Sequence, residues 1–125
     1  MIRQVRLSNG AKEQLIRLKT RTGIGQWNVL CRWAFCTSLA EPTPPTPIDI
    51  ATDSNVEMTW EVFAGPWGEL YEALLVDRVR RDHGGSDVAV DEETFRRQFT
   101  LHLHRGIGYL ATPGRVTRVE DLWAG

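Results

Sequence analysis

The sequence is poor in cysteine and contains no long apolar run. Cys31 and Cys36 are the only cysteines among 125 residues. Their spacing of five places them about 140° apart on a helix, so they cannot form a disulfide within one. We expect both to be reduced core thiols of a cytoplasmic protein. No segment approaches the roughly 18 apolar residues of a membrane span, and no secretion signal opens the chain, so we expect neither a secreted nor a membrane protein.

The sequence also lacks the motifs of common catalytic and metal sites. It has no glycine-rich phosphate loop ending in GK[ST], no HExxH helix and no GxSxG nucleophile turn. His102 and His104 lie about 200° apart on a helix, so they cannot chelate one ion together. We expect His102 to be an interior histidine, and we predict no catalytic residue, no metal and no cofactor.

The composition is that of an ordinary globular domain, with 42% apolar and 25% charged residues. The length suits one domain, which we expect to span residues 1–125. Within it we expect a basic strand–helix–helix part at 1–40, a proline-rich loop at 41–57 and a helical part at 58–125. The five tryptophans more often fill a core or a subunit contact than stack on bases.

The charges are unevenly distributed along the chain, although the net charge is only −1. Residues 1–40 carry a net charge of +6, residues 41–93 of −10, and residues 94–125 of +3. A local basic surface can bind a polyanion because charges are screened beyond about 8 Å. The acidic middle can instead neutralise the basic ends, within one subunit or between subunits, and the charge pattern leaves both interpretations open.

The first forty residues predict a strand followed by two helices. Residues 2–7 alternate apolar and polar side chains, as in a short strand or extended arm. Ser8 or Asn9 can cap the first helix, and Gly23 can end it in a left-handed conformation. Its apolar stripe is Ala11, Leu15, Leu18 and Thr22. The second helix is expected over 26–39, with a stripe of Trp27, Leu30, Cys31, Ala34, Phe35 and Ser38, and a cluster of prolines follows it.

The remaining residues predict two further helices. Residues 58–63 alternate as in a short strand. From Gly65 to near Asp82 a helix carries the stripe Trp67, Leu70, Tyr71, Leu74, Leu75 and Val79. Asp91 caps a fourth helix, whose stripe is Phe95, Phe99, Leu103, Gly106 and Leu110. The predicted fold class is mainly α: a compact four-helix domain with an N-terminal strand or arm.

The order of basic strand, helix, glycine turn and helix matches the ribbon-helix-helix plan. In that plan two chains pair their strands and place the ribbon in the DNA major groove. Arg3 and Arg6 are three apart and would face opposite sides of a strand, so only one of them could enter a groove. The first half is therefore predicted to be ribbon-helix-helix-like, although plain helical hairpins share much of this layout.

Basic side chains on the helices form candidate phosphate contacts. On the first helix the two lysines share one face and two arginines share another, and the second helix begins with free amides that can seat a phosphate. On the fourth helix two arginines lie near Thr100 and His104. The alternative is that these are simply solvated helix faces. The candidate DNA-binding residues are Arg3, Arg6, Lys12, Arg17, Lys19, Arg21, Arg32, Arg96 and Arg97.

Several strings in the chain resemble a known family. They are RLS at 6–8, RTG at 21–23, N-x-LCR-x-A-x-C-x-SL at 28–39, YEALL at 71–75 and VTRVEDL at 116–122. The string at 28–39 is the most specific of these. Together they cover most of the chain, which resembles the DndE family of the DNA phosphorothioation system.

The resemblance implies a small helical protein that assembles as a homotetramer and binds DNA, with a preference for nicked duplex. It implies partners: a cysteine desulfurase, an iron–sulfur enzyme and an ATPase-like protein, which together replace a non-bridging phosphate oxygen of DNA with sulfur. The glycine turn of the family corresponds here to Gly23, Ile24, Gly25 and Gln26, and is expected to be a subunit contact for oligomerisation.

The predicted function is therefore that of a non-catalytic DNA-binding subunit of the phosphorothioation complex. Three alternatives stay open. One is a metal-dependent DNA nickase of the same system, in which acids of the third and fourth helices hold the metal. Another is a ribbon-helix-helix repressor with one tight palindromic site. The third is an assembly scaffold that does not contact nucleic acid.

Overall fold

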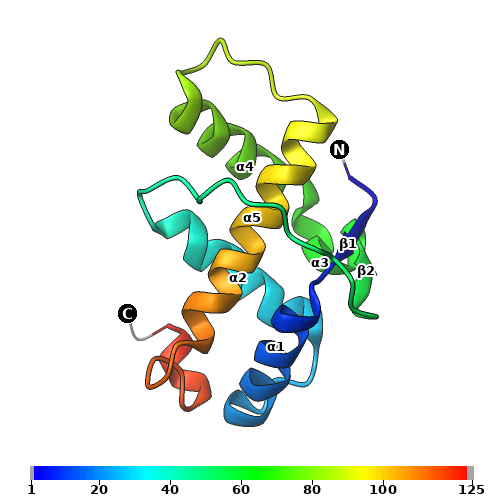
Figure 1. Cartoon of the computed structure of the whole chain (residues 1–125), viewed down its shortest axis with the longest axis vertical. Coiled ribbons are helices and arrows are strands. Elements are labelled where there is room, and N and C mark those ends of the chain that lie inside the picture. Colours follow the sequence, from blue (N-terminus) through cyan, green and yellow to red (C-terminus); the bar gives the residue numbers. More distant parts are fainter. Residues whose placement is uncertain (1, 124–125) are drawn as a thin grey trace.

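Residues 2–123, which the computed structural model describes, contain four helices of 14 to 20 residues. The mainly α fold class is confirmed (Figure 1). None of these helices combines the length and apolar content needed to cross a membrane. The elements in chain order are β1 (Gln4–Arg6), α1 (Asn9–Thr22), α2 (Trp27–Ala40), β2 (Glu57–Thr59), α3 (Trp60–Ala64), the 3₁₀ turn η1 (Gly65–Trp67), α4 (Gly68–His83), α5 (Glu92–Ala111) and the 3₁₀ turn η2 (Val119–Leu122).

The predicted helix ends are confirmed at three positions. Ser8 precedes α1, and its Oγ accepts a hydrogen bond from the Ala11 amide at 3.0 Å. Gly23 ends α1 with φ of 76°, a left-handed conformation that favours glycine. Asp91 caps α5 by accepting from the Thr94 amide at 2.8 Å. The predicted stripes of α1 and α5 are buried at every position.

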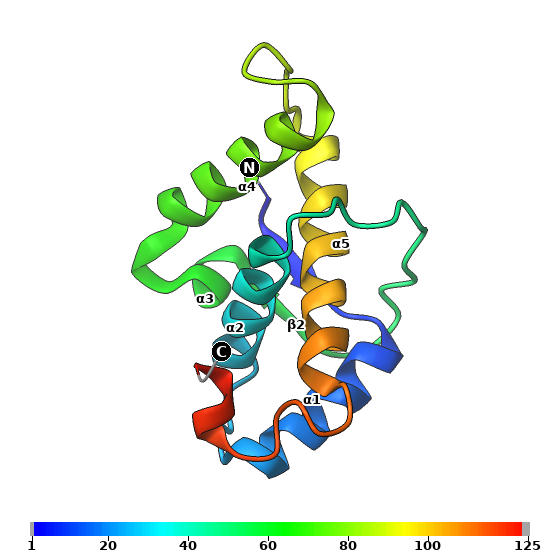
Figure 2. The ribbon, with the colours of Figure 1, turned by 90° about the vertical axis from the view of Figure 1, so that its left-hand side faces the viewer.

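The two central helices, α2 and α5, lie side by side and pack closely (Figure 2). A Cβ built on Gly106 of α5 would lie 1.7 Å from the carbonyl oxygen of Ala34 on α2. The absence of a side chain at Gly106 therefore permits this approach. Around it, Phe35 and Phe99 have ring centroids 5.1 Å apart, and Phe63 lies 5.0 Å from Phe99. An aromatic cluster thus fills the centre of the core.

The strand β1 pairs with β2 of the same chain in antiparallel register, with Gln4 opposite Thr59 and Arg6 opposite Glu57. The first half therefore has the predicted strand–helix–helix order. Its strand, however, is paired with β2 of its own chain rather than with a second copy, as the ribbon-helix-helix plan requires.

The strand predicted over 58–63 is wrong beyond Thr59. The Thr59 side chain accepts from the Val62 amide at 3.1 Å and caps α3. Trp60 and Phe63, three residues apart, are then both buried, as helical spacing requires. A short alternation of apolar residues fits both structures, and the cap at Thr59 selects the helix.

Two burial predictions are wrong as well. On α4, Leu75 and Val79 are buried, but Trp67 on η1 and Leu70 and Leu74 on α4 are exposed. Of the two cysteines, Cys31 is a core thiol, and burial raises its pKa to about 12. Cys36 is exposed.

Candidate nucleic-acid interface

The first basic surface lies on α1, where Lys12, Arg17 and Lys19 have no carboxylate partner among the described residues. Lys12 Nζ donates to the amide oxygen of Asn55 at 2.6 Å. Lys19 Nζ lies 3.5 Å from the ring centroid of Trp27. Arg17 is exposed. Since an amide and an indole ring are uncharged, neither contact neutralises a lysine. The two lysines lie at one edge of the exposed side of α1 and Arg17 at the other, about 140° around the helix, with the exposed Glu13 between them. We call these three cations the α1 basic face.

The fourth cation of α1, Arg21, is placed differently. Its side chain is half-buried, and its Nη1 is buried without a hydrogen-bond partner in residues 2–123. Only part of the guanidinium therefore faces solvent, and we leave Arg21 out of the α1 basic face.

The second basic surface joins β1 to α5. Arg6 and Arg96 line one small hollow of about 110 Å³, and Arg96 and Arg97 line the next one along α5, of about 310 Å³. Here carboxylates offset the charge. Arg6 is 3.1 Å from Glu57, and Arg96 is 3.1 Å from Glu92. Exposed ion pairs of this kind contribute about 1 kcal/mol or less. A phosphate could displace these carboxylates from Arg6 and Arg96.

The remaining candidate cations are Arg3 and Arg32. Arg3 is exposed immediately before β1. Arg32 is half-buried in a groove between α2 and α4, which is also lined by Trp33, Cys36 and Tyr71. The structure therefore distributes the predicted DNA-binding residues over three places rather than gathering them on one face.

His104, predicted to lie beside Arg96 and Arg97 on a basic surface, is not a surface cation. Its Nε2 accepts from the Ser8 amide at 3.1 Å, and its Nδ1 donates to the Thr100 carbonyl at 2.8 Å. Burial lowers the pKa of His104, which favours the neutral ring that this pair of bonds requires. Through its hydrogen bond with the Ser8 amide, His104 links the start of α1 to α5.

The predicted phosphate seat at the start of α2 is next to the α1 basic face. Gln26 precedes the helix, and its side chain makes no capping hydrogen bond within the described chain. The Gln26 side chain therefore leaves the first amides of α2 uncapped. Trp27, the first residue of α2, contacts Lys19 of the α1 basic face. In the turn before α2, Gly23 and Gly25 are exposed, and a Cβ at Gly25 would meet nothing within 4 Å.

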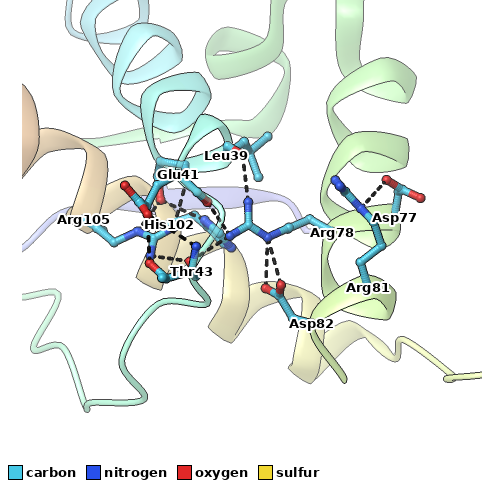
Figure 3. Close-up of polar contacts among 10 residues, drawn as sticks. Leu39, Glu41, Thr43, Asp77, Arg78, Arg81, Asp82, His102 and Arg105 are labelled. Atoms are coloured by element: carbon cyan, nitrogen blue, oxygen red, sulfur yellow. Dashed lines mark hydrogen bonds and ion pairs between the residues drawn. The ribbon is translucent and has the colours of Figure 1, made fainter. Parts of the chain in front are cut away.

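Two arginines that the sequence did not single out form a buried polar cluster at the end of α2 (Figure 3). Arg78 of α4 is only 3% exposed and forms an ion pair with Asp82 at 3.0 Å. Its remaining nitrogens donate to the carbonyl oxygens of Leu39, Glu41 and Thr43 at 2.6–2.8 Å. The sequence contained a signal for this, since Arg78 and Asp82 fall on the helical face of Leu75 and Val79.

Arg105 of α5 completes the cluster from the other side. It donates to the carbonyl oxygens of Ser38 and Thr43 at 2.9 and 2.7 Å, and to Ser38 Oγ at 2.8 Å. Ser38 Oγ also shares a 2.8 Å hydrogen bond with Nδ1 of His102, which is fully buried. Burial, together with Arg105 and Arg78, lowers the pKa of His102 to about 4. The prediction of an interior histidine is confirmed. The cluster anchors the proline-rich segment, and Arg105 at its edge also lines a cavity of about 430 Å³ together with Pro45 and Ile48.

The acidic side chains do not gather into a metal centre in the part of the chain that the structure describes. Residues 2–123 contain no group of three or more His, Cys, Asp or Glu side chains positioned to hold an ion.

Comparisons with known proteins agree on one family. The family model described as DNA sulphur modification protein DndE matches residues 4–117. The crystal structure of DndE from Escherichia coli B7A, involved in DNA phosphorothioation modification, aligns with a TM-score of 0.71 at 21% identity. It covers 88% of this chain and 98% of that one. A DndE mutant with two glycines replaced by lysine aligns with a TM-score of 0.64 at 18% identity, covering 88% and 97%. Among curated proteins, no sequence matches.

Proposed function

Since this chain belongs to the DndE family of DNA sulphur modification proteins, we propose that it is the non-catalytic DNA-binding subunit of a DNA phosphorothioation complex. It binds duplex or nicked DNA through basic surfaces that are repeated in a homotetramer. Its partners are a cysteine desulfurase, an iron–sulfur enzyme and an ATPase-like protein. The observation that supports the DNA-binding role is the α1 basic face, whose three cations form no ion pair with a carboxylate among residues 2–123.

The α1 basic face suits contact with the phosphate backbone. Lysine and arginine side chains that neutralise phosphates release counterions and contribute affinity without reading sequence. The arginines of the β1–α5 surface act as a second, weaker contact, because Glu57 and Glu92 already pair with Arg6 and Arg96. The expected binding is therefore dependent on salt and indifferent to base sequence.

Oligomerisation multiplies these weak contacts. One chain has a net charge of −1, so a single basic face gives only modest attraction to DNA. Several copies binding one duplex gain affinity through effective concentration. We propose the turn at Gly23, Ile24, Gly25 and Gln26 as the subunit contact, because all of it but the half-buried Ile24 is exposed, and because it ends α1 and would place one α1 basic face close to the next.

The proposal is tested by measuring DNA affinity against salt concentration. We expect Lys12→Ala/Arg17→Ala/Lys19→Ala to weaken binding to nicked and intact duplexes of any sequence. If each side chain neutralises one phosphate, the slope of log affinity against log salt falls by about 2.7. The matched control, R81A/R115A/R118A, removes three exposed arginines elsewhere and keeps the wild-type slope. Equal effects of the two triple variants would refute the role of the α1 basic face.

Two further assays separate this proposal from its alternatives. Supercoiled plasmid is incubated with the protein and magnesium or manganese, with EDTA as control. Metal-dependent relaxation that copurifies with the protein would favour a nickase. Light scattering measures the oligomeric state. A monomer that does not bind DNA at low salt would contradict the proposal, and one tight palindromic site over a weak background would favour a repressor.

A further inference from the structure

The outer side of α3 and α4 carries an apolar surface that the chain leaves uncovered. Trp67 is 58% exposed, Leu70 52%, Val62 51% and Leu74 41%. Trp67, Leu70 and Leu74 are spaced three and four residues apart, so they follow one line along the helix. Helical spacing predicts a buried stripe at these positions, but in this structure α4 buries the neighbouring arc of Leu75 and Val79 instead. We call the four exposed residues the α4 apolar face.

A hollow adjoins this face and can receive a side chain. The groove between α2 and α4, of about 290 Å³, is lined by Val29, Arg32, Trp33, Cys36 and Tyr71. Tyr71 lies three residues before Leu74, so the groove borders the α4 apolar face. Large aromatic and aliphatic side chains that lie beside a pocket are the usual centres of protein–protein contacts.

The rim of the face is acidic. Glu61 lies beside Val62 and Glu69 beside Leu70, and both carboxylates are exposed. The sequence contains no lysine or arginine from Trp33 to Asp77. The cations that adjoin the face are Arg32 of α2, which lies in the groove, and Arg81 further along α4, which is paired with Asp77 at 3.0 Å. Electrostatic complementarity then favours a partner with positive charge at its edges.

A second copy of this chain does not fit these requirements. In a two-fold contact of the face with itself, the acidic rims of both copies would be brought together, and like charges repel. A head-to-tail contact with the basic α1 of a neighbour would meet one large exposed apolar residue on that helix, Ile16, at 46% exposure. Of these two surfaces of a second copy, the α4 apolar face carries charge of the wrong sign, and the basic helix α1 has too few exposed apolar side chains.

We propose that the α4 apolar face docks an amphipathic helix of a different protein, one that presents leucine-like side chains flanked by lysine or arginine. An apolar stripe at helical spacing places its side chains along Trp67, Leu70 and Leu74, and one of them enters the groove beside Tyr71. The flanking cations face Glu61 and Glu69. This surface uses none of the residues of the α1 basic face, so protein docking and DNA binding proceed on separate residues.

The test is calorimetric titration of the full chain with a synthetic 14-residue peptide of leucine and lysine in amphipathic helical order. Control peptides are a scrambled sequence and a leucine–glutamate analogue. We expect L70S/L74S to weaken binding of the leucine–lysine peptide at least tenfold. The matched control I48S, at an apolar residue 56% exposed outside the face, leaves binding unchanged. E61Q/E69Q weakens binding several-fold and lowers its salt dependence, and it leaves the apolar side chains in place.

Three results would overturn the proposal. The first is absence of binding, or equal binding of the leucine–glutamate and scrambled peptides. The second is equal affinity of wild-type and L70S/L74S proteins. The third is self-association of the wild-type protein that L70S/L74S abolishes, since the face would then join copies of this chain. DNA affinity measured on the same variants keeps this test apart from the proposed function, because L70S/L74S is expected to bind DNA as the wild type does.

Discussion

Replacing Gly106 with alanine tests the close approach of the two central helices. The added methyl group would lie 1.7 Å from the carbonyl oxygen of Ala34, 2.4 Å from its carbonyl carbon and 3.0 Å from its Cα. All three atoms belong to the backbone of α2, so no side-chain rotation relieves the overlap. A carbon normally approaches a carbonyl oxygen to about 3.3 Å, so α2 and α5 would have to separate by roughly 1.5 Å.

The expected loss in free energy of unfolding follows from the packing that this separation of α2 and α5 would disrupt. Overpacking a core usually costs about 1–3 kcal/mol, and a gap of even about 1 Å loses up to half of the dispersion energy across it. Phe35 and Phe99 pack across this interface with ring centroids 5.1 Å apart. We therefore expect G106A to lower the free energy of unfolding by about 3 kcal/mol or more, a large part of the ~5–15 kcal/mol of a typical domain.

Urea and thermal unfolding, followed by circular dichroism, measure this cost. At ~4 °C per kcal/mol, the midpoint of G106A should fall by at least about 10 °C. The matched control is G108A, two residues along the same helix, where a Cβ meets nothing within 4 Å. That substitution should stabilise the protein by about 0.5–1 kcal/mol, because alanine favours the helix. Equal midpoints for G106A and G108A would refute the argued helix contact.

Two other predictions concern the buried polar cluster. R78A leaves Asp82 buried without its partner and frees the segment around Thr43, so it should cost about 3–5 kcal/mol in urea unfolding; a loss below about 1 kcal/mol would contradict this. His102, whose pKa is lowered to about 4, stays neutral while an unfolded chain takes up a proton below pH ~6.5. Stability from this group is complete above pH ~6.5 and is lost as the pH falls to about 4. Unfolding free energies from pH 7 to 4 should therefore decline less in H102N than in the wild type, and parallel declines would refute this.

Local signals in the sequence predicted α1 and α5 well. Ser8, Gly23 and Asp91 are capping residues whose preferences come from hydrogen bonds and backbone conformation within one turn. Because these effects are local, they can be predicted without knowing what packs against the helix. The same reasoning predicted the buried stripe of α5, including Gly106, although not how closely Ala34 approaches it.

Tertiary contacts decided the features that the sequence did not predict. The apolar residues of α4 fit a buried stripe, but the elements that pack on α4, chiefly α5 and α3, cover only the arc that includes Leu75 and Val79. Arg78 and Asp82 lie on that arc, but their partners at the end of α2 come from a distant part of the sequence. The distribution of the candidate DNA-binding cations was unpredictable for the same reason. Arg6 is neutralised by Glu57, whereas Lys12 contacts the uncharged amide of Asn55. Both partners come from a distant segment of the chain.

The polar cluster holds the last turn of α2 and the residues after it through Arg78 and Arg105. At Leu39, Glu41 and Thr43 the two arginines bind main-chain oxygens alone. Every amino acid, proline included, supplies that oxygen. At Leu39, Glu41 and Thr43 these hydrogen bonds do not depend on the side chain. Many amino acids at those three positions would therefore keep them. The two arginines have no such freedom, since a lysine lacks the planar fork that spans several acceptors at once. As far as these hydrogen bonds are concerned, we expect substitutions at Leu39, Glu41 and Thr43 to be tolerated and substitutions of Arg78 and Arg105 to be destabilising.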